Sequence, residues 1–202
     1  MSVSATDVKE LRDRTGAGMM ECKRALEEAG GDADKAVEIL RVKGQAKAAR
    51  RSERAVAEGV VSHYAHFNGR VGALVEVNCE TDFVARNEEF LEFARQVAIH
   101  VASAAPRWVS EEDVPEEVKQ AERAVLEQQA DESKPPDVRA KMTEGRLRKW
   151  LEEVVLLDQR HVNADRYEGR TIEQIRADVS AKTGENIVIR RFARFAVGEA
   201  DE

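Results

Sequence analysis

The stretch VVSHYAHFNGRVGALVEVN, residues 60–78, carries the clearest fold signal in this sequence. Its two halves, 60–67 and 70–78, are rich in β-branched and aromatic residues, which favour β-strands. Asn68-Gly69 lies between them, and this dipeptide is typical of a type I′ turn, in which both central residues have positive φ. The sequence therefore predicts a β-hairpin here.

Upstream of the hairpin, capping residues and glycines divide residues 1–45 into three short helices. Ser4 to Asp7 has the spacing of a capping box, and the third helix is expected to end near Gly44. The Ala-rich, charged segment 46–58 is interpreted as a helical linker. These patterns predict a small three-helix head with a thin core.

Downstream, residues 59–202 are expected to form a core α+β domain. Asn87 is placed to cap a helix with apolar residues on one face, and residues 186–197 are expected to form a last strand. Together with the β-hairpin this strand makes a small antiparallel three-stranded sheet with helices. The fold class is therefore predicted to be α+β.

A helical hairpin is expected as an insertion in this core domain, at about residues 116–153. Residues 116–132 and 137–153 both have helical patterns, and Lys134-Pro135-Pro136 separates them. Proline ends a helix because it lacks the amide donor and clashes with the preceding turn. Two helices of similar length joined by a short break predict an antiparallel pair.

Composition narrows the class of protein. With 42% hydrophobic residues the chain is expected to fold, and its apolar runs fall far short of the roughly 20 residues that span a bilayer. The first ten residues have no apolar core of the signal-peptide type. A cytoplasmic protein without membrane contact is expected. The net charge of −7 argues against a protein that coats nucleic acid, so no direct nucleic-acid binding is expected.

The sequence offers no strong pattern for a metal, a cofactor or a covalent reaction. Cys22 and Cys79 form neither a metal motif nor a disulfide framework. No G-x-x-x-x-G-K loop is present, so the chain is not expected to bind nucleotide itself. A thiol enzyme that pairs Cys79 with His63 or His66 is one alternative. We expect no cofactor, no metal and no enzymatic activity.

Three segments resemble the elongation factor Ts family, and they occur in the family's order. They are residues 8–26 with TGAGMMECKRAL, residues 75–85 with VEVNCETDFVA, and residues 184–192 with GENIVIRRF. The resemblance implies a ubiquitin-associated-like head, a core sheet and a helical hairpin module. It also implies a guanine nucleotide exchange factor for translation elongation, which binds elongation factor Tu with GDP and Mg²⁺ and expels the nucleotide.

The resemblance is to the short form of the family. The long form has two related core subdomains, whereas this chain has one Asn-Gly hairpin and one C-terminal strand. The short form compensates by pairing two chains. Homodimerisation is therefore implied by the resemblance.

The same resemblance implies which residues contact the partner. The Asp-Phe pair of the family inserts into the nucleotide domain beside the Mg²⁺ region. The corresponding residues here are Thr81, Asp82, Phe83 and Val84. The head is expected to hold the nucleotide domain through Thr15, Gly16, Ala17, Gly18, Met19 and Met20. His66, beside the hairpin turn, is a further possible partner contact.

Two structural alternatives compete with these site assignments. Phe83 can instead pack into its own core while Asp82 caps a turn. Met19 and Met20 can both lie in the core of the head, although adjacent helical residues point about 100° apart and unequal burial is expected.

A second alternative function is RNA binding through a basic run. The run lacks the interleaved aromatic residues that stack on single strands, so a solvated linker is favoured, and one that helps steer the chain toward an acidic partner. The run consists of Arg41, Lys43, Lys47, Arg50, Arg51 and Arg54.

Overall fold

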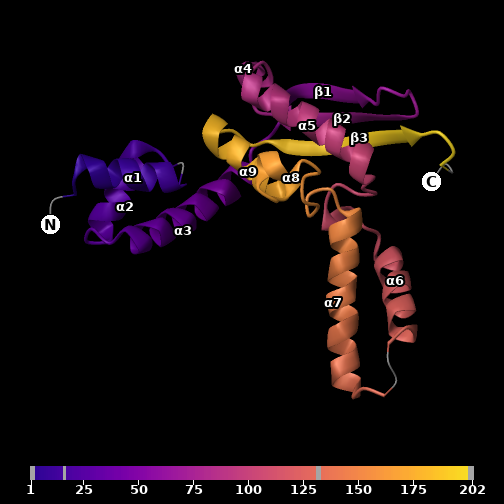
Figure 1. Cartoon of the computed structure of the whole chain (residues 1–202). Helices are drawn as coiled ribbons and strands as arrows, with labels where there is room; N and C mark the ends of the chain where they lie inside the picture. Colours follow the sequence, from indigo (N-terminus) through magenta and orange to yellow (C-terminus); the bar gives the residue numbers. More distant parts are fainter. Residues whose placement is uncertain (1–2, 16, 131–132, 200–202) are drawn as a thin grey trace. The chain divides into compact units, whose positions relative to one another are not determined.

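The computed structural model describes residues 3–15, 17–130 and 133–199. The chain divides into two compact units, residues 1–54 and 55–202. The first unit is helical, and the second combines helices with a single three-stranded antiparallel sheet (Figure 1). The predicted α+β class is confirmed.

The first unit is a head of three helices, α1 (Ala5–Thr15), α2 (Met19–Glu28) and α3 (Ala33–Ser52). The expected capping box is present, because the Ser4 amide donates to Asp7 Oδ2 and the Asp7 amide donates to Ser4 Oγ. Apolar side chains from all three helices meet in one small core. They are Val8, Leu11, Cys22, Ala25, Leu26 and Ala36.

The third helix is longer than expected. It continues through Gly44 to Ser52, so the expected end near Gly44 is wrong. A glycine inside a helix costs only about 1 kcal/mol relative to alanine, and good helix formers flank this one. The helical part of the segment interpreted as a linker therefore belongs to α3, and β1 already begins at Glu58.

The sheet of the second unit has the strand order β1 (Glu58–Ala65), β2 (Val71–Cys79) and β3 (Val188–Ala196). Both pairings are antiparallel. Helix α5 (Glu88–Ala104) lies across one face of the sheet (Figure 1). The apolar side chains of this face and of α5 form the main core, which includes Val75, Val77, Phe90, Val97 and Ile189.

The turn between β1 and β2 differs from the expected type I′ turn. Among the described non-glycine residues only Ala105 and Glu168 have positive φ, so Asn68 does not. The Gly69 amide donates to the His66 carbonyl at 2.8 Å, which places Phe67 and Asn68 at the centre of the turn. Gly69 follows with φ +66°. The loop is thus a type I-like turn followed by a left-handed glycine, the arrangement of longer hairpin loops.

The predicted helical hairpin is present as α6 (Glu116–Gln128) and α7 (Pro136–Val154), preceded by a 3₁₀ turn, Glu111–Asp113. Val114, Leu151 and Val155 form a small buried cluster at its base. After α7 the chain forms α8 (Ala164–Tyr167) and α9 (Ile172–Thr183). No helix in the described part of the chain is long and apolar enough to cross a membrane.

Two buried histidines hold the segment after α7 against α5. His100 Nδ1 accepts from the Val162 amide at 3.1 Å, and its Nε2 lies 2.8 Å from Gln159 Oε1. His161 Nδ1 accepts from the Asn163 amide, and its Nε2 lies 3.2 Å from the Gln96 carbonyl. Burial lowers the pKa of His100 to about 4 and also lowers the pKa of His161. Both rings are therefore neutral near pH 7.

Candidate functional site

The candidate site is the corner that joins β2 to α5. Here Thr81 begins the one-turn helix α4 (Asp82–Ala85), and its hydroxyl accepts from the Val84 amide. Arg86 and the cap residue Asn87 follow before α5 begins. The end of a buried strand and the start of a buried helix thus hold both ends of this short turn.

The turn presents Phe83 to solvent. Its side chain is 83% exposed, whereas the neighbouring Val84 is half-buried and packs against the main core. The alternative in which Phe83 packs into its own core is therefore wrong. A large apolar side chain at such exposure contributes little to folding and is available to a partner.

The carboxylate of Glu185 fixes the backbone on the other side of the turn. Glu185 Oε2 accepts from the amides of Glu80 at 3.0 Å and Thr81 at 3.1 Å, and its Oε1 accepts from the Thr81 hydroxyl at 2.6 Å. In return, Glu80 Oε1 accepts from the Asn186 amide at 2.6 Å. These reciprocal hydrogen bonds, here called the clamp, hold the corners β2–α4 and α9–β3 together.

Asp82 does not cap the turn, because Thr81 occupies that position. Its carboxylate lies 3.2 Å from the Arg86 guanidinium, and the Asp82 side chain is 46% exposed. An ion pair at this exposure contributes little to stability. The Asp82 carboxylate therefore remains accessible beside Phe83.

The geometry argues against a thiol enzyme. Cys79 is buried on the helix-covered face, and its Sγ donates to the Thr81 carbonyl at 3.2 Å. Burial, followed by the nearby Glu185 carboxylate, raises the pKa of Cys79 to about 11. His63 is exposed on the opposite face, and His66 lies at the other end of the strands. The thiolate that nucleophilic chemistry requires is thus disfavoured.

In the head, the expected contact residues surround the start of α2. Thr15 ends α1, Gly18 caps α2, and Ala17 packs against the core of the head. Met19 and Met20 are 52% and 58% exposed. The alternative that buries both side chains is therefore wrong, and the expectation that they are unequally buried is also wrong. The buried stripe of α2 begins only at Cys22, which leaves the first turn open. The expectation for Gly16 lies outside the described residues.

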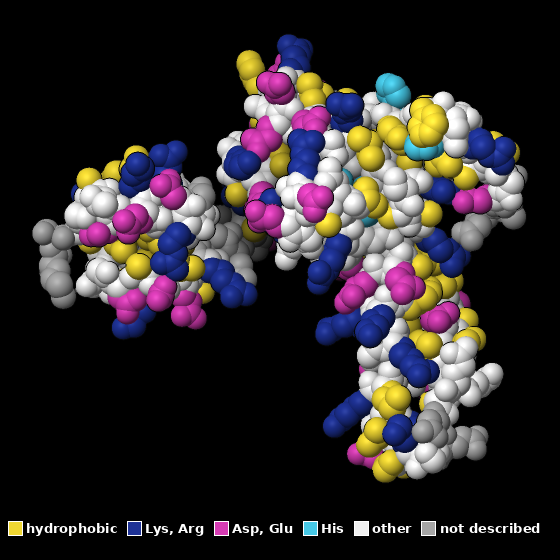
Figure 2. Space-filling view, in the orientation of Figure 1, with side chains coloured by type: hydrophobic (Ala, Val, Ile, Leu, Met, Phe, Trp, Pro, Cys, Tyr) yellow, Lys and Arg dark blue, Asp and Glu magenta, His cyan; other side chains and the backbone are white. Residues whose placement is uncertain are grey.

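The β1–β2 turn carries a second exposed aromatic residue that the sequence analysis missed. Phe67 is 92% exposed, and its ring lies 4.4 Å from that of His66. His66 is half-buried, and its Nδ1 lies 2.9 Å from the Tyr64 hydroxyl. Hydrophobic and histidine side chains gather over this end of the sheet (Figure 2). An aromatic residue just before Asn-Gly, at the tip of a hairpin, has no core to face, and this signal was available in the sequence.

The basic run of α3 is partly paired within the head. Lys43 forms an ion pair with Glu28, and Arg51 is half-buried. No aromatic residue occurs between positions 41 and 54. Helix α3 therefore gains no stacking platform of the kind that single-stranded RNA binding uses.

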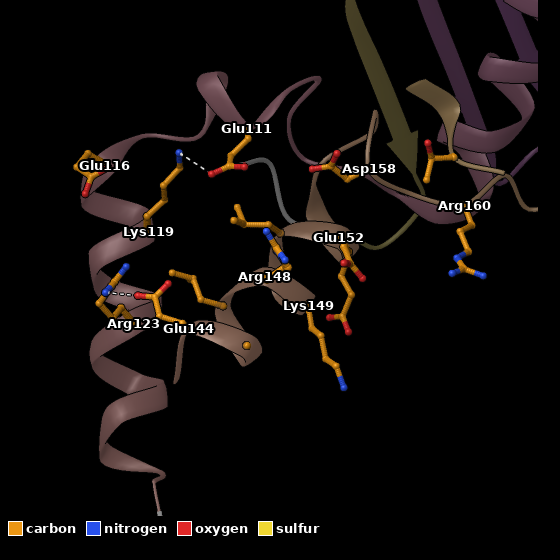
Figure 3. A pocket seen from close by; sticks show the side chains of 15 residues that line it. Glu111, Glu116, Lys119, Arg123, Glu144, Arg148, Lys149, Glu152, Asp158 and Arg160 are labelled. Atoms are coloured by element: carbon orange, nitrogen blue, oxygen red, sulfur yellow. Dashed lines mark ion pairs between the residues drawn. The ribbon is translucent and has the colours of Figure 1, made fainter. Parts of the chain in front are cut away.

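A hollow of about 1130 Å³ lies between the two helices of the hairpin and its base (Figure 3). Four of its charged side chains form two ion pairs: Lys119 lies 3.8 Å from Glu111, and Arg123 lies 2.5 Å from Glu144. Within the described residues, no group of three or more His, Cys, Asp or Glu side chains is arranged to hold a metal ion. The hollow has the mixed charge of a solvated groove and lacks the apolar lining typical of a ligand pocket.

Comparison with known proteins shows the family to which the whole sequence is similar. The family described as elongation factor TS matches residues 26–168, more than half of the chain. Elongation factor Ts of Thermosipho melanesiensis is 52% identical over 198 residues, which cover 98% of this chain and 100% of the relative. The protein of that name from Carboxydothermus hydrogenoformans is 54% identical, with 98% and 90% covered. That of Thermodesulfovibrio yellowstonii is 45% identical, with 100% of both chains covered.

Proposed function

Because the chain belongs to the elongation factor Ts family, we propose that it is a guanine nucleotide exchange factor that makes elongation factor Tu release GDP during translation elongation. The observation that carries this proposal is the presentation of Phe83, 83% exposed on a turn that is held at both ends. Exchange makes and breaks no covalent bond, so no residue here acts as an enzyme's catalytic group. Nucleotide exchange on elongation factor Tu takes place in the cytoplasm, where translation occurs.

The proposed mechanism is displacement of the Mg²⁺ and phosphate ligands of the partner. In P-loop proteins the metal ion bridges the phosphates and the protein, so moving the surrounding loops removes ligands from the ion. Phe83 supplies an apolar wedge for this step. The carboxylate of Asp82, which is accessible beside Phe83, recruits polar groups of the partner.

Thermodynamic coupling then sets the order of events. If this chain weakens GDP binding to elongation factor Tu, GDP weakens the binding of this chain by the same factor. The complex with the nucleotide-free partner is therefore the tight one, and an incoming nucleotide dissolves it. The chain itself binds no nucleotide and no metal.

We assign three surfaces to the partner. The corner 81–84 acts at the nucleotide site, the three-helix head holds the nucleotide domain, and the turn with His66 adds a contact. Phe67 belongs with His66, because the two rings touch and Phe67 is 92% exposed. Adaptable methionines suit the head contact, which is assigned to Thr15, Gly16, Ala17, Gly18, Met19 and Met20.

The first prediction is acceleration of GDP release. Stopped-flow fluorescence of labelled GDP on elongation factor Tu is expected to give a release rate that rises with the concentration of this chain and then saturates. Equilibrium dialysis of the chain alone with labelled GDP is expected to detect no binding. An unchanged release rate at micromolar concentrations of the chain would refute the proposed function.

We also propose that the active assembly is a homodimer formed through the open face of the sheet. The face opposite α5 exposes Val61 and Leu74 on the first two strands and Phe195 on the third, at 62%, 48% and 71%. The negative charge of Glu76 on this face is compensated by Arg190 and Arg191. A second copy with the same apolar face covers it symmetrically.

The second prediction tests this surface. Phe195→Glu places a charge in the proposed contact and is expected to shift the chain from dimer to monomer in light scattering, because an unpaired charge at a buried interface costs several kcal/mol. Val125→Glu, on the exposed side of α6, is the matched control and is expected to leave the dimer intact. A wild-type chain that is monomeric when free and when bound, with full exchange activity, would overturn the dimer.

A further inference from the structure

We propose that Glu185 is a positioning residue for nucleotide exchange, because it sets the backbone geometry from which Phe83 reaches the partner. This inference rests on the proposed function and goes beyond it. Glu185 lies 104 positions from Thr81 in the sequence. It is nevertheless the side chain that binds the start of the α4 turn with three hydrogen bonds.

Glu185 is itself held in place by its neighbours in the chain. It follows Gly184, which ends α9 with φ +76° and donates its amide to the Ser180 carbonyl at 3.0 Å. The hydroxyl of the buried Ser180 donates to the Glu185 carbonyl at 2.6 Å. On the far side, the Asn186 amide is bound by Glu80. Glu185 therefore fixes the α4 turn relative to the end of α9.

The turn α4 is anchored to the main core only through two half-buried side chains, Val84 and Ala85, so the hydrogen bonds at its start matter for its orientation. It is a single turn of four residues without a buried residue of its own, and Val84 is only half-buried. At the start of this turn, one side chain receives two backbone amides and a hydroxyl. Removing it leaves Phe83 attached to a turn that moves relative to the core.

Glu185 acts through its hydrogen bonds and not through its charge. Both carboxylate oxygens are engaged within the chain. In Glu185→Gln, the amide oxygen still accepts from the two backbone amides, and the amide nitrogen donates to the Thr81 hydroxyl, which also accepts. Glu185→Gln thus keeps the clamp without the charge, whereas Glu185→Ala loses it.

The experiment measures GDP release from elongation factor Tu for wild type, Glu185→Ala, Glu185→Gln, Phe83→Ala and the double variant that combines Glu185→Ala with Phe83→Ala. We expect Glu185→Ala to lower the exchange rate at subsaturating concentration by roughly tenfold, and Glu185→Gln to stay within about threefold of wild type. In the Phe83→Ala background, Glu185→Ala is expected to cost no more than about twofold. This lack of additivity marks residues that act as a unit.

Hydrogen exchange supplies an independent readout. The amides of Val84 and Ala85 are expected to exchange faster in Glu185→Ala, with α5 and β2 unchanged. Glu92→Ala is the matched control: it removes another bonded carboxylate, on α5, whose partners include Arg166 at 2.8 Å and Gln96 at 3.0 Å. Glu92→Ala is expected to leave exchange activity within about twofold of wild type.

The outcomes separate the positioning role from the proposed function. If wild type itself does not release GDP, the proposed function fails. If wild type is active and Glu185→Ala matches it, or lowers the rate by the same factor with and without Phe83, the positioning role is overturned. If Glu185→Gln is as impaired as Glu185→Ala, Glu185 acts through its charge and the clamp is not the cause.

Discussion

Phe83→Ala is expected to lower the rate of GDP release by roughly thirtyfold while the chain keeps its stability. An aromatic anchor removed from the centre of a protein interface commonly costs about 2 kcal/mol or more, which corresponds to that factor. Phe83 is 83% exposed in the free chain, so truncation removes little buried area. The expected change in the free energy of unfolding is within about 0.5 kcal/mol, as for other surface positions.

Stopped-flow GDP release and thermal unfolding on the same preparation measure both quantities. Val125→Ala removes another exposed apolar side chain, on α6, and is expected to change neither. Phe83→Leu keeps part of the apolar wedge and is expected to fall between wild type and Phe83→Ala. A large drop in melting temperature with normal exchange would contradict both the exposed position of Phe83 and its assignment to the partner.

The second unit, residues 55–202, is expected to lose stability as the pH falls from 6.5 toward 4, because it buries neutral histidines. Burial lowers the pKa of His100 from 6.5 to about 4, so in this window the unfolded chain binds a proton that the folded chain does not. Protonation at Nδ1 would also break the bond from the Val162 amide. His100 alone is expected to remove about 2 kcal/mol of unfolding free energy between pH 7 and pH 5. His161 adds a loss of the same sign, since its pKa is also lowered.

Guanidinium unfolding at pH 7 and pH 5, followed by tryptophan fluorescence, measures this loss. The chain has two tryptophans, Trp108 and Trp150, and both lie in the second unit. The fluorescence therefore follows the unfolding of that unit. His100→Gln is expected to be less stable at pH 7 but less sensitive to pH. His63→Gln changes an exposed histidine and is expected to keep the slope of wild type. Equal slopes for wild type and His100→Gln would contradict the prediction, and NMR titration of the wild-type imidazoles tests it without a variant.

Local chemistry alone determined much of this protein. The capping residues Ser4, Asp32 and Asn87 begin helices because their side chains bind amides only two or three residues away. Pro136 begins α7 for an equally local reason, since the amide that proline lacks has no helical partner at the first position. The β-branched and aromatic residues of the stretch 60–78 located the first two strands. The motif around Asp82-Phe83 located the candidate site through its resemblance to the family.

Local signals failed where two tendencies compete. Gly44 has the residue type of a helix end, but its neighbours favour helix and α3 passes through it. Asn68-Gly69 has the composition of a two-residue turn, but the pairing of Ala65 with Gly72 leaves a longer loop and a different turn. In both places the energy difference between the alternatives is small, so packing and strand register decide.

Only the tertiary structure decided which side chains face solvent at the site. Whether Phe83 is buried depends on what covers α4, and a motif of a few residues contains no such information. The clamp depends on Glu185 and Thr81, which lie 104 positions apart and meet only because β3 pairs with β2. Solvent exposure and long-range hydrogen bonds are properties of the packed chain, because each requires two distant segments to occupy neighbouring space.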